Sequence, residues 1–382
     1  MGLGLGFFRL VLSIWVIDHH FGWSRTYVEP ALVERFGVEN FGYLGIGHIS
    51  VMAFFVLSGY VITWVMNNKY PSNGTGARAF LMGRFIRIYP LYWTIITIIA
   101  IIFWLTTAPG EMRPQLQIER VIGDYLLIPY GIIGFFWFFN RYAYGMIDVP
   151  AWTLPYDMVF YLIAPWVVMR KGVLVAIIVL ELIYVAAVAQ LGPQHFDGWH
   201  EAYFTTGHAT LLAFAVGALA YYYRQVEIPA WLFLLATFGL LYFAFAPYGL
   251  TNLYLNHVLV IAVATVLVVA LKKRSPLDNL FSELTYSTYL LHLPVYEALL
   301  WFGVSYAGIA ALVMTYVLSF ATVKYFEAPL EAKRAALTRA MLQDAGEAGG
   351  AAPLAGSRLV VGGFMALIIV SAFSNLWQFS QS

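Results

Sequence analysis

The sequence contains no cysteine among its 382 residues, and only 11% of its residues are charged. Without cysteine the chain has no disulfide, no iron–sulfur cluster, no zinc thiolate site and no cysteinyl thioester intermediate. It also lacks a glycine-rich phosphate loop and a basic, aromatic patch for nucleic acid. We find no convincing internal repeat. This weighs against a transporter, because many transporters are built from repeats.

The sequence is instead rich in long hydrophobic segments. Hydrophobic residues make up 61% of the chain and the mean hydropathy is +0.75. A bilayer core about 30 Å thick needs roughly 20 apolar residues per helix. The runs do not alternate with a period of two, which favours helices over a β-barrel. We therefore expect an all-α polytopic membrane protein with eleven spans near 6–23, 42–66, 86–106, 150–169, 173–191, 203–223, 229–247, 254–271, 284–303, 307–326 and 358–377.

Basic residues gather on one side when the N-terminus is placed in the cytoplasm and each span crosses once. Cytoplasmic loops are enriched in Lys and Arg, so the pattern predicts a cytoplasmic N-terminus and an external C-terminus. The remaining five basic residues are mixed with acidic residues on the outer face. The 16 of 21 that face the cytoplasm are Arg9, Lys69, Arg78, Arg84, Arg87, Arg170, Lys171, Arg224, Lys272, Lys273, Arg274, Lys324, Lys333, Arg334, Arg339 and Arg358.

Residues 121–139 are apolar enough to suggest a twelfth span. If they crossed the membrane, the basic residues at 170–171 and 272–274 would move to the outer side. An aspartate, a proline and two glycines also interrupt the run. We therefore interpret the segment as re-entrant or interfacial on the outer face.

The chain divides by composition into three parts. Residues 1–330 read as one membrane domain. Residues 331–357 are a cytoplasmic linker, whose first half (EAKRAALTRAML) predicts a surface helix and whose second half is small and flexible. Residues 358–382 add one transmembrane helix and a short outer tail.

Ionisable side chains inside the spans carry the functional signal, because each costs on the order of 2.5–3.5 kcal/mol at the centre of a membrane helix. The first span contains Arg9 and His20. At eleven residues apart they differ by about 20° around a helix and by about 16 Å along it. One helix face thus presents a cation low in the membrane and an imidazole near the outer side. The structural alternative is a snorkelling arginine and an interhelical hydrogen bond from the histidine.

Two further motifs have both a structural and a functional interpretation. Ser58-Gly59 in the second span permits close helix approach, and packing alone explains it. Arg84 and Arg87 lie at the expected cytoplasmic boundary of the third span. They either set the topology or hold phosphate groups, since guanidinium offers planar paired donors that stay charged.

Two more polar residues interrupt apolar spans. Asp157 lies near the outer entry to the span at 150–169. It is either a solvated acid at a helix start or a partner that orients an imidazole or an acceptor hydroxyl. His292 lies in the middle of the span at 284–303 and is either structural or lines the donor site.

Six sequence blocks stand out along the chain: Arg9-x10-His20 and residues 54–63, 84–93, 152–165, 285–294 and 326–329. Taken in this order, they resemble the acyltransferase-3 family of NodX-like membrane O-acyltransferases, over residues from about 5 to 330. Gly83 stands where the family commonly has arginine. Asp157 replaces the usual glutamate, so its carboxylate reaches one methylene less far than the carboxylate of the family.

The resemblance implies a ten-helix acyltransferase bundle, followed here by one C-terminal transmembrane helix. It implies transfer of an acyl group, usually acetyl, from cytoplasmic acyl-CoA to a hydroxyl of an extracytoplasmic acceptor. The expected partners are acyl-CoA, a carbohydrate or lipid-linked glycan acceptor and membrane lipids, with no nucleic acid, no metal and no permanently bound cofactor. The expected location is the bacterial inner membrane.

Within that implied chemistry, His20 is the general base or the acyl-accepting group. We expect Arg9 to grip the donor or stabilise developing charge, and Asp157 to orient His20 or the acceptor. We expect the donor to contact Arg84, Arg87, Ser58 and His292. The competing interpretations are a multispan transporter, an envelope-assembly protein, and a different multispan acyltransferase class with His and Asn at its centre.

Overall fold

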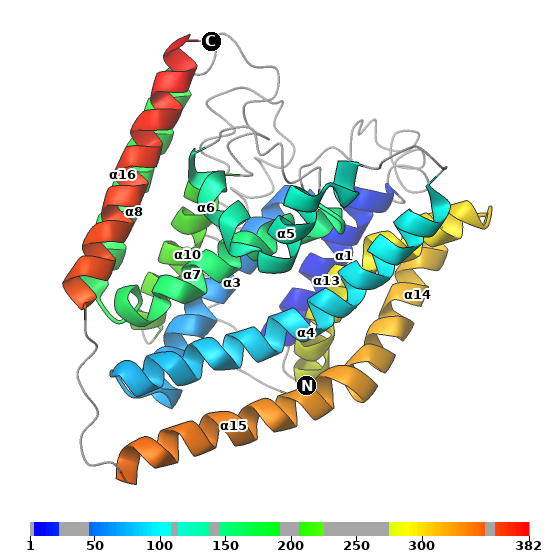
Figure 1. Cartoon of the computed structure of the whole chain (residues 1–382), viewed down its shortest axis with the longest axis horizontal. Helices are drawn as coiled ribbons and strands as arrows, with labels where there is room; N and C mark the ends of the chain where they lie inside the picture. Colours follow the sequence, from blue (N-terminus) through cyan, green and yellow to red (C-terminus); the bar gives the residue numbers. More distant parts are fainter. Residues whose placement is uncertain are drawn as a thin grey trace, which may run out of the picture. The chain divides into compact units, whose positions relative to one another are not determined.

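The structure is a computed structural model that describes residues 4–22, 46–107, 114–136, 146–191, 206–224, 275–347 and 356–381 (Figure 1). Five helices in these residues are long and apolar enough to cross a membrane: Ser50–Lys69, Gly74–Thr106, Lys171–Val188, Ala307–Gln343 and Ser357–Gln378. Gly207–Tyr222 is a shorter apolar helix. The protein is an all-α polytopic membrane protein, as the composition predicts.

Nine of the eleven expected spans fall on helices, and the two at 229–247 and 254–271 lie outside the described residues. The elements are α1 (Leu5–Phe21), α3 (Ile46–Lys69), α4 (Gly74–Thr106), η3 (Pro114–Leu116), α5 (Ile118–Leu126), α6 (Ile128–Phe136), η5 (Val149–Thr153), α7 (Leu154–Val167), α8 (Lys171–Leu191), α10 (Gly207–Tyr222), α13 (Pro276–Trp301), α14 (Ala307–Thr322), the π-helical turn η6 (Val323–Glu327), α15 (Ala328–Glu347) and α16 (Ser357–Gln381).

Three expected spans differ from their helices, and one of them is the ninth, because α13 begins at Pro276 and not at 284. The third span was expected from residue 86, but α4 begins at Gly74 and runs for 33 residues. The side chain of Asn73 caps this earlier start by accepting from Gly76 N–H at 2.8 Å. The fourth is a 3-10 turn followed by α7, whose 14 residues are about 21 Å long. Residues on every side of α7 are buried, as expected for a helix enclosed by protein.

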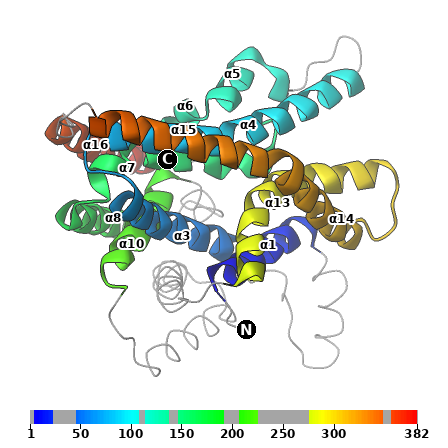
Figure 2. The same cartoon turned by 90° about the horizontal axis from the view of Figure 1, so that it is seen from below.

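The chain forms two compact units, one from Met1–Phe54 with Glu227–Phe326 and one from Phe55–Val226 with Glu327–Ser382. In the first unit, α1 lies beside α13, which also packs against α14 (Figure 2). Its core contains Ile17, Phe21, Val295 and Ala311. These apolar side chains come from all three helices, so their burial holds the three together.

Helices α1 and α13 run in the same direction. Near their starts, the Phe7 N–H donates to Asp278 Oδ1 at 2.9 Å, and near the end of α1, His20 meets His292. This agrees with the predicted topology, in which the first and the ninth spans both cross from the cytoplasm to the outside. The start of α13 is set by Ser275, whose hydroxyl accepts from the Asp278 N–H at 3.1 Å.

In the second unit, α8 packs against α10, α4 against α15 and α6 against α7, and α16 contacts α6, α7 and α8. The part of α3 in this unit approaches α10 backbone to backbone. A Cβ on Gly59 would lie 2.1 Å from the Phe214 carbonyl oxygen, and one on Gly217 would lie 1.9 Å from that of Val56. The close approach predicted for Ser58-Gly59 is therefore confirmed, and packing alone requires glycine at 59.

The segment 121–139 is described as far as Phe136, where it forms α5 and α6. Each has nine residues and is about 14 Å long, less than half the thickness of a bilayer core of about 30 Å. Leu127 separates them with a φ of 61°, and Tyr130 of α6 donates to the Arg120 carbonyl of α5 at 3.0 Å. The break and the contact between the two helices support the re-entrant or interfacial interpretation.

A buried carboxyl lies in the last turns of α5. Asp124 is completely buried, and its Oδ2 accepts from the Ile147 N–H at 2.8 Å. Burial raises the pKa of Asp124 to about 7, because the charged form loses its hydration. The hydrogen bond ties α5 to the chain that leads into η5 and α7.

Candidate active site

Two histidines meet in the first unit, one from α1 and one from α13. His20 Nδ1 lies 2.7 Å from His292 Nε2, and the two ring planes are inclined by only 6°. Gly22, with a φ of 63°, ends α1 just after this turn. His292 is completely buried, whereas His20 is exposed. The structure thus pairs a predicted catalytic residue with a predicted donor-lining residue.

The hydrogen bonds assign the tautomers of this pair. His292 Nδ1 lies 2.7 Å from the Tyr289 carbonyl oxygen and 3.3 Å from that of Thr288. Carbonyls only accept, so Nδ1 of His292 carries a proton, and in neutral His292 the Nε2 is an acceptor. His20 must then donate from its Nδ1.

It follows that neutral His20 has its lone pair on Nε2. Hydrogen bonds thus link the Tyr289 carbonyl, His292 and His20, and in the neutral pair the Nε2 of the exposed His20 imidazole is unprotonated. That arrangement is suited to a general base or a nucleophile, because the partner on the far nitrogen fixes both the tautomer and the ring orientation.

Arg9 lies on the same continuous helix as His20, eleven residues earlier, and is half-buried. Ser13, between them, is buried and bonded to the Tyr316 hydroxyl of α14 at 2.7 Å. The polar residues expected along one stripe of the first span are thus carried by one helix, and Ser13 faces its packed side.

In the second unit, Arg84 has aromatic and acidic partners. Its guanidinium carbon lies 5.2 Å from the Phe80 ring centroid and 5.5 Å from that of Tyr161, within the range of cation–π attraction. Asp157 attracts Arg84 electrostatically and is hydrogen-bonded to Tyr161. The sequence did not indicate this partnership. Since α4 starts at Gly74, Arg84 lies ten residues after the first residue of its helix, which corrects the expected helix start and leaves its place at the cytoplasmic membrane boundary a prediction.

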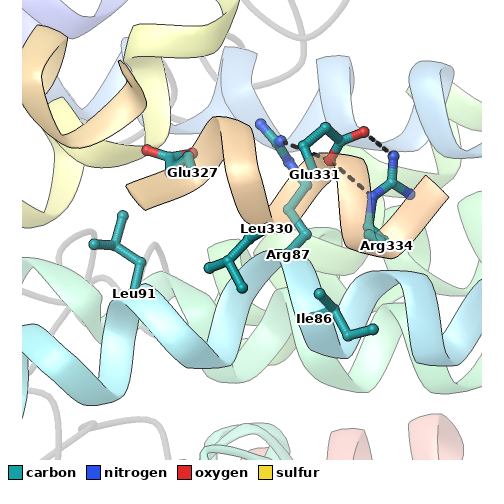
Figure 3. A pocket seen from close by; sticks show the side chains of 7 residues that line it. All are labelled: Ile86, Arg87, Leu91, Glu327, Leu330, Glu331 and Arg334. Carbon is teal, nitrogen blue, oxygen red and sulfur yellow. Dashed lines mark hydrogen bonds and ion pairs between the residues drawn. The ribbon is translucent and has the colours of Figure 1, made fainter. Parts of the chain in front are cut away.

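Arg87 faces α15, one turn further along α4. Its Nη1 lies 3.8 Å from Glu331 Oε2, and Glu331 also bonds Arg334 (Figure 3). These side chains border a shallow hollow between α4 and α15. The hollow is lined by Ile86, Arg87, Leu91, Glu327, Leu330, Glu331 and Arg334. The surface helix predicted from EAKRAALTRAML is present as α15, and it brings Glu331 and Arg334 to Arg87.

Sequence reasoning missed a buried polar network in the second unit. His208 Nδ1 lies 3.0 and 3.1 Å from the Glu181 oxygens, and its Nε2 lies 3.1 Å from Ser371 Oγ. All three side chains are completely buried. Glu181 and His208 each lie in an expected span, so the cost of an ionisable group in the membrane was the signal that could have found them. Across the described part of the chain, no three His, Asp or Glu side chains gather as metal ligands.

Comparison with known families agrees with the resemblance. A family model for an acyltransferase domain matches residues 3–324, so α16 and α15 lie beyond the match. No curated protein and no solved structure matches the chain. Because the match spans most of the sequence and includes both histidines of the pair and both arginines of α4, the chain belongs to the acyltransferase-3 family of membrane acyltransferases.

Proposed function

We propose that this acyltransferase moves an acetyl group from cytoplasmic acetyl-CoA to a hydroxyl of an extracytoplasmic, cell-envelope carbohydrate, in the inner membrane of a bacterium. The observation that carries the proposal is the hydrogen-bond chain from the Tyr289 carbonyl through His292 to His20. It holds His20 in the tautomer that has its lone pair on Nε2, and acyl transfer to a hydroxyl requires such a base or nucleophile.

Two routes use that nitrogen. In the direct route, Nε2 takes the proton of the acceptor hydroxyl as its oxygen attacks the thioester carbonyl carbon. The carbon–sulfur bond then breaks, and the departing thiolate of coenzyme A recovers the proton from His20. In the relay route, Nε2 attacks the thioester carbon, the carbon–sulfur bond breaks and the coenzyme A thiolate leaves with an acyl-imidazole formed. The acceptor oxygen then attacks the acyl carbon, the carbon–nitrogen bond breaks to return His20, and the hydroxyl proton goes to the thiolate. In both routes His292 Nε2 keeps accepting the Nδ1–H of His20, and this helps the ring carry positive charge.

The cationic residues suit the anionic donor. Arg84 and Arg87, on one helix, bind the phosphates of the acyl-CoA, since guanidinium pairs well with phosphate oxygens. Asp157 holds Arg84 in place from α7. Arg9 stabilises charge near the thioester, and Ser58 lines the path of the donor. These roles rest on residue chemistry together with the partners described above.

The test is transfer of radiolabelled acetyl from acetyl-CoA by the purified full chain in proteoliposomes, with extracted envelope glycans as acceptor. His20→Ala should lower transfer by at least about a hundredfold, the lower end of what a general base contributes. His19→Ala is the matched control, because it removes the neighbouring imidazole of the same helix. Its rate should stay within about twofold of wild type, as for a residue outside the chemistry.

Two results would speak against the proposal: full transfer by His20→Ala, or equal loss in both variants while both insert normally. Omitting the acceptor separates the two routes. Label that remains on wild type, but not on His20→Ala, identifies the acyl-imidazole. If acetyl-CoA does not bind wild-type protein at all, the donor is wrong, and transport becomes the better explanation.

A further inference from the structure

The hollow beside Arg87 is formed by two helices, and only one of them belongs to the matched family region. Helix α4 lies within residues 3–324, whereas α15 begins at Ala328. Helix α15 packs along α4 in the second unit. Figure 3 shows Arg87 extending from α4 toward Glu331, with Arg334 on the other side of the carboxylate. Glu331 therefore lies between two guanidiniums from different helices.

Glu331 is shared by two guanidiniums. Its two oxygens bond Arg334, and one of them also lies 3.8 Å from Arg87 Nη1. Arg84 is within electrostatic reach of both of these arginines and of Glu331, but it also interacts with Asp157. Glu327 lines the same hollow, and Glu331 is the carboxylate that Arg87 and Arg334 share there. The side chains remain partly accessible, at 35% for Arg87, 44% for Glu331 and 19% for Arg334, so an anion from solution can reach them.

The position of Arg334 depends on a missing side chain. A Cβ on Gly83 would lie 3.3 Å from Arg334 Nη1, which is tighter than ordinary van der Waals contact. Arg334 thus occupies the space over α4 that a side chain at 83 would enter. Position 83 is one helical turn from Arg87, so the guanidinium of α15 extends the row of positive charge along α4.

We propose that α15 completes the phosphate-binding site of the donor: Arg334 is a third guanidinium for the phosphates, and Glu331 is a built-in competitor that they displace. This rests on the proposed function. The hollow is a shallow surface site, so it would receive a phosphate group of the donor and not the whole ligand. A phosphate group competes with a single carboxylate for arginine through its extra charge and oxygens.

The experiment measures the Kd of coenzyme A by titration calorimetry for the full chain in phosphatidylcholine nanodiscs. Arg334→Gln should weaken binding by about tenfold, the effect of losing one charged hydrogen-bonding partner. Glu331→Gln should tighten it by about threefold, because the competitor is neutralised at a partly exposed site. Lys333→Gln, which removes an exposed cation of the same helix, should leave Kd within about twofold.

Opposite signs for Arg334→Gln and Glu331→Gln cannot come from a general loss of folding, although each change breaks the same ion pair. A rescue adds a second measurement: Gly83→Arg in the Arg334→Gln background returns a guanidinium to the same space, from α4. It should recover most of the lost affinity.

Three outcomes overturn the inference. The first is that Arg87→Gln weakens binding but Arg334→Gln does not, which leaves the proposed function intact. The second is that wild type does not bind coenzyme A, and then the proposed function fails as well. The third is that Arg334→Gln changes only the effect of added phosphatidylglycerol, which would make the site one for lipid headgroups.

Discussion

The protein contains two hydrogen-bond networks centred on histidine, one in each unit, and they differ in exposure and in their partners. In the first unit, His292 donates to backbone carbonyls and accepts one hydrogen bond from His20, which is exposed. In the second unit, His208 lies between Glu181 and Ser371, and all three are completely buried. The order Glu–His–Ser resembles a hydrolase triad, yet access and proton placement differ.

The hydroxyl of Ser371 has one hydrogen, and it goes to the Leu367 carbonyl at 2.6 Å. Ser371 Oγ is then the acceptor of the His208 Nε2–H, so no lone pair on His208 is left to activate the hydroxyl. The network instead fastens α16 to α8 and α10, helped by Asn375, whose side-chain N–H donates to the Phe135 carbonyl at 2.9 Å. The two networks therefore differ in access: His20 is exposed, whereas His208 is completely buried.

The largest expected effect tests the positioning role of His292. His292→Ala should lower kcat for acetyl transfer by about 10²–10⁴-fold, because His20 loses the partner that fixes its tautomer. KM for the donor should change little. His292→Gln should recover part of the rate, since its amide oxygen can accept from the Nδ1–H of His20. Steady-state kinetics on purified variants would measure both. Equal rates for the Ala and Gln variants would show that His292 does not act by fixing the tautomer of His20.

The second prediction concerns the buried network alone. Glu181→Leu should destabilise the protein by about 3–5 kcal/mol, the cost of leaving one member of a buried ion pair without its partner. Thermal unfolding in detergent would report the loss. Glu181→Leu combined with His208→Leu should cost less, because no unpaired polar group remains. Transfer per folded molecule should stay at wild-type level in both, and a larger loss in the double variant would contradict the ion-pair assignment.

The smallest effect separates an anchor from a nucleophile. Ser371→Ala should cost about 1–3 kcal/mol of stability, since the His208 Nε2–H loses its acceptor. Acetyl transfer should be unchanged, measured in proteoliposomes at a temperature where both proteins are folded. If Ser371→Ala folds normally but transfers no acetyl group, the buried His208 network is needed for catalysis, and its purely structural role is wrong.

Much of the helical layout followed from the sequence, because a run of apolar residues reports directly on membrane insertion. The long helices α3, α8 and α16 lie close to the expected spans. The break in 121–139 was signalled by its proline, glycines and aspartate, and the chain does break there, at Leu127. The beginning of α4 was missed by twelve residues, because residues 74–85 contain two arginines and three glycines, which neither extend an apolar run nor favour a helix. The Asn73 cap at Gly76 N–H starts the helix there.

The candidate site was predictable as a set of residues but not as a set of partners. His20 was selected by its spacing from Arg9 and by the family resemblance, whereas its bond to His292 joins residues 272 positions apart. Asp157 was expected beside an imidazole or an acceptor, and its described partners are Arg84 and Tyr161. Composition reports the cost of burying a polar group but not which neighbour offsets that cost.

By itself the sequence determined that this is an all-helical membrane protein of the acyltransferase-3 family, because hydropathy and short motifs are local properties of the chain. Only the tertiary structure decided that His20 pairs with His292 and that His208 joins Glu181 and Ser371. It also decided that α15 brings Arg334 and Glu331 to Arg87. Tautomers and charge balance depend on atoms within about 3–4 Å, and those atoms come from helices far apart along the chain.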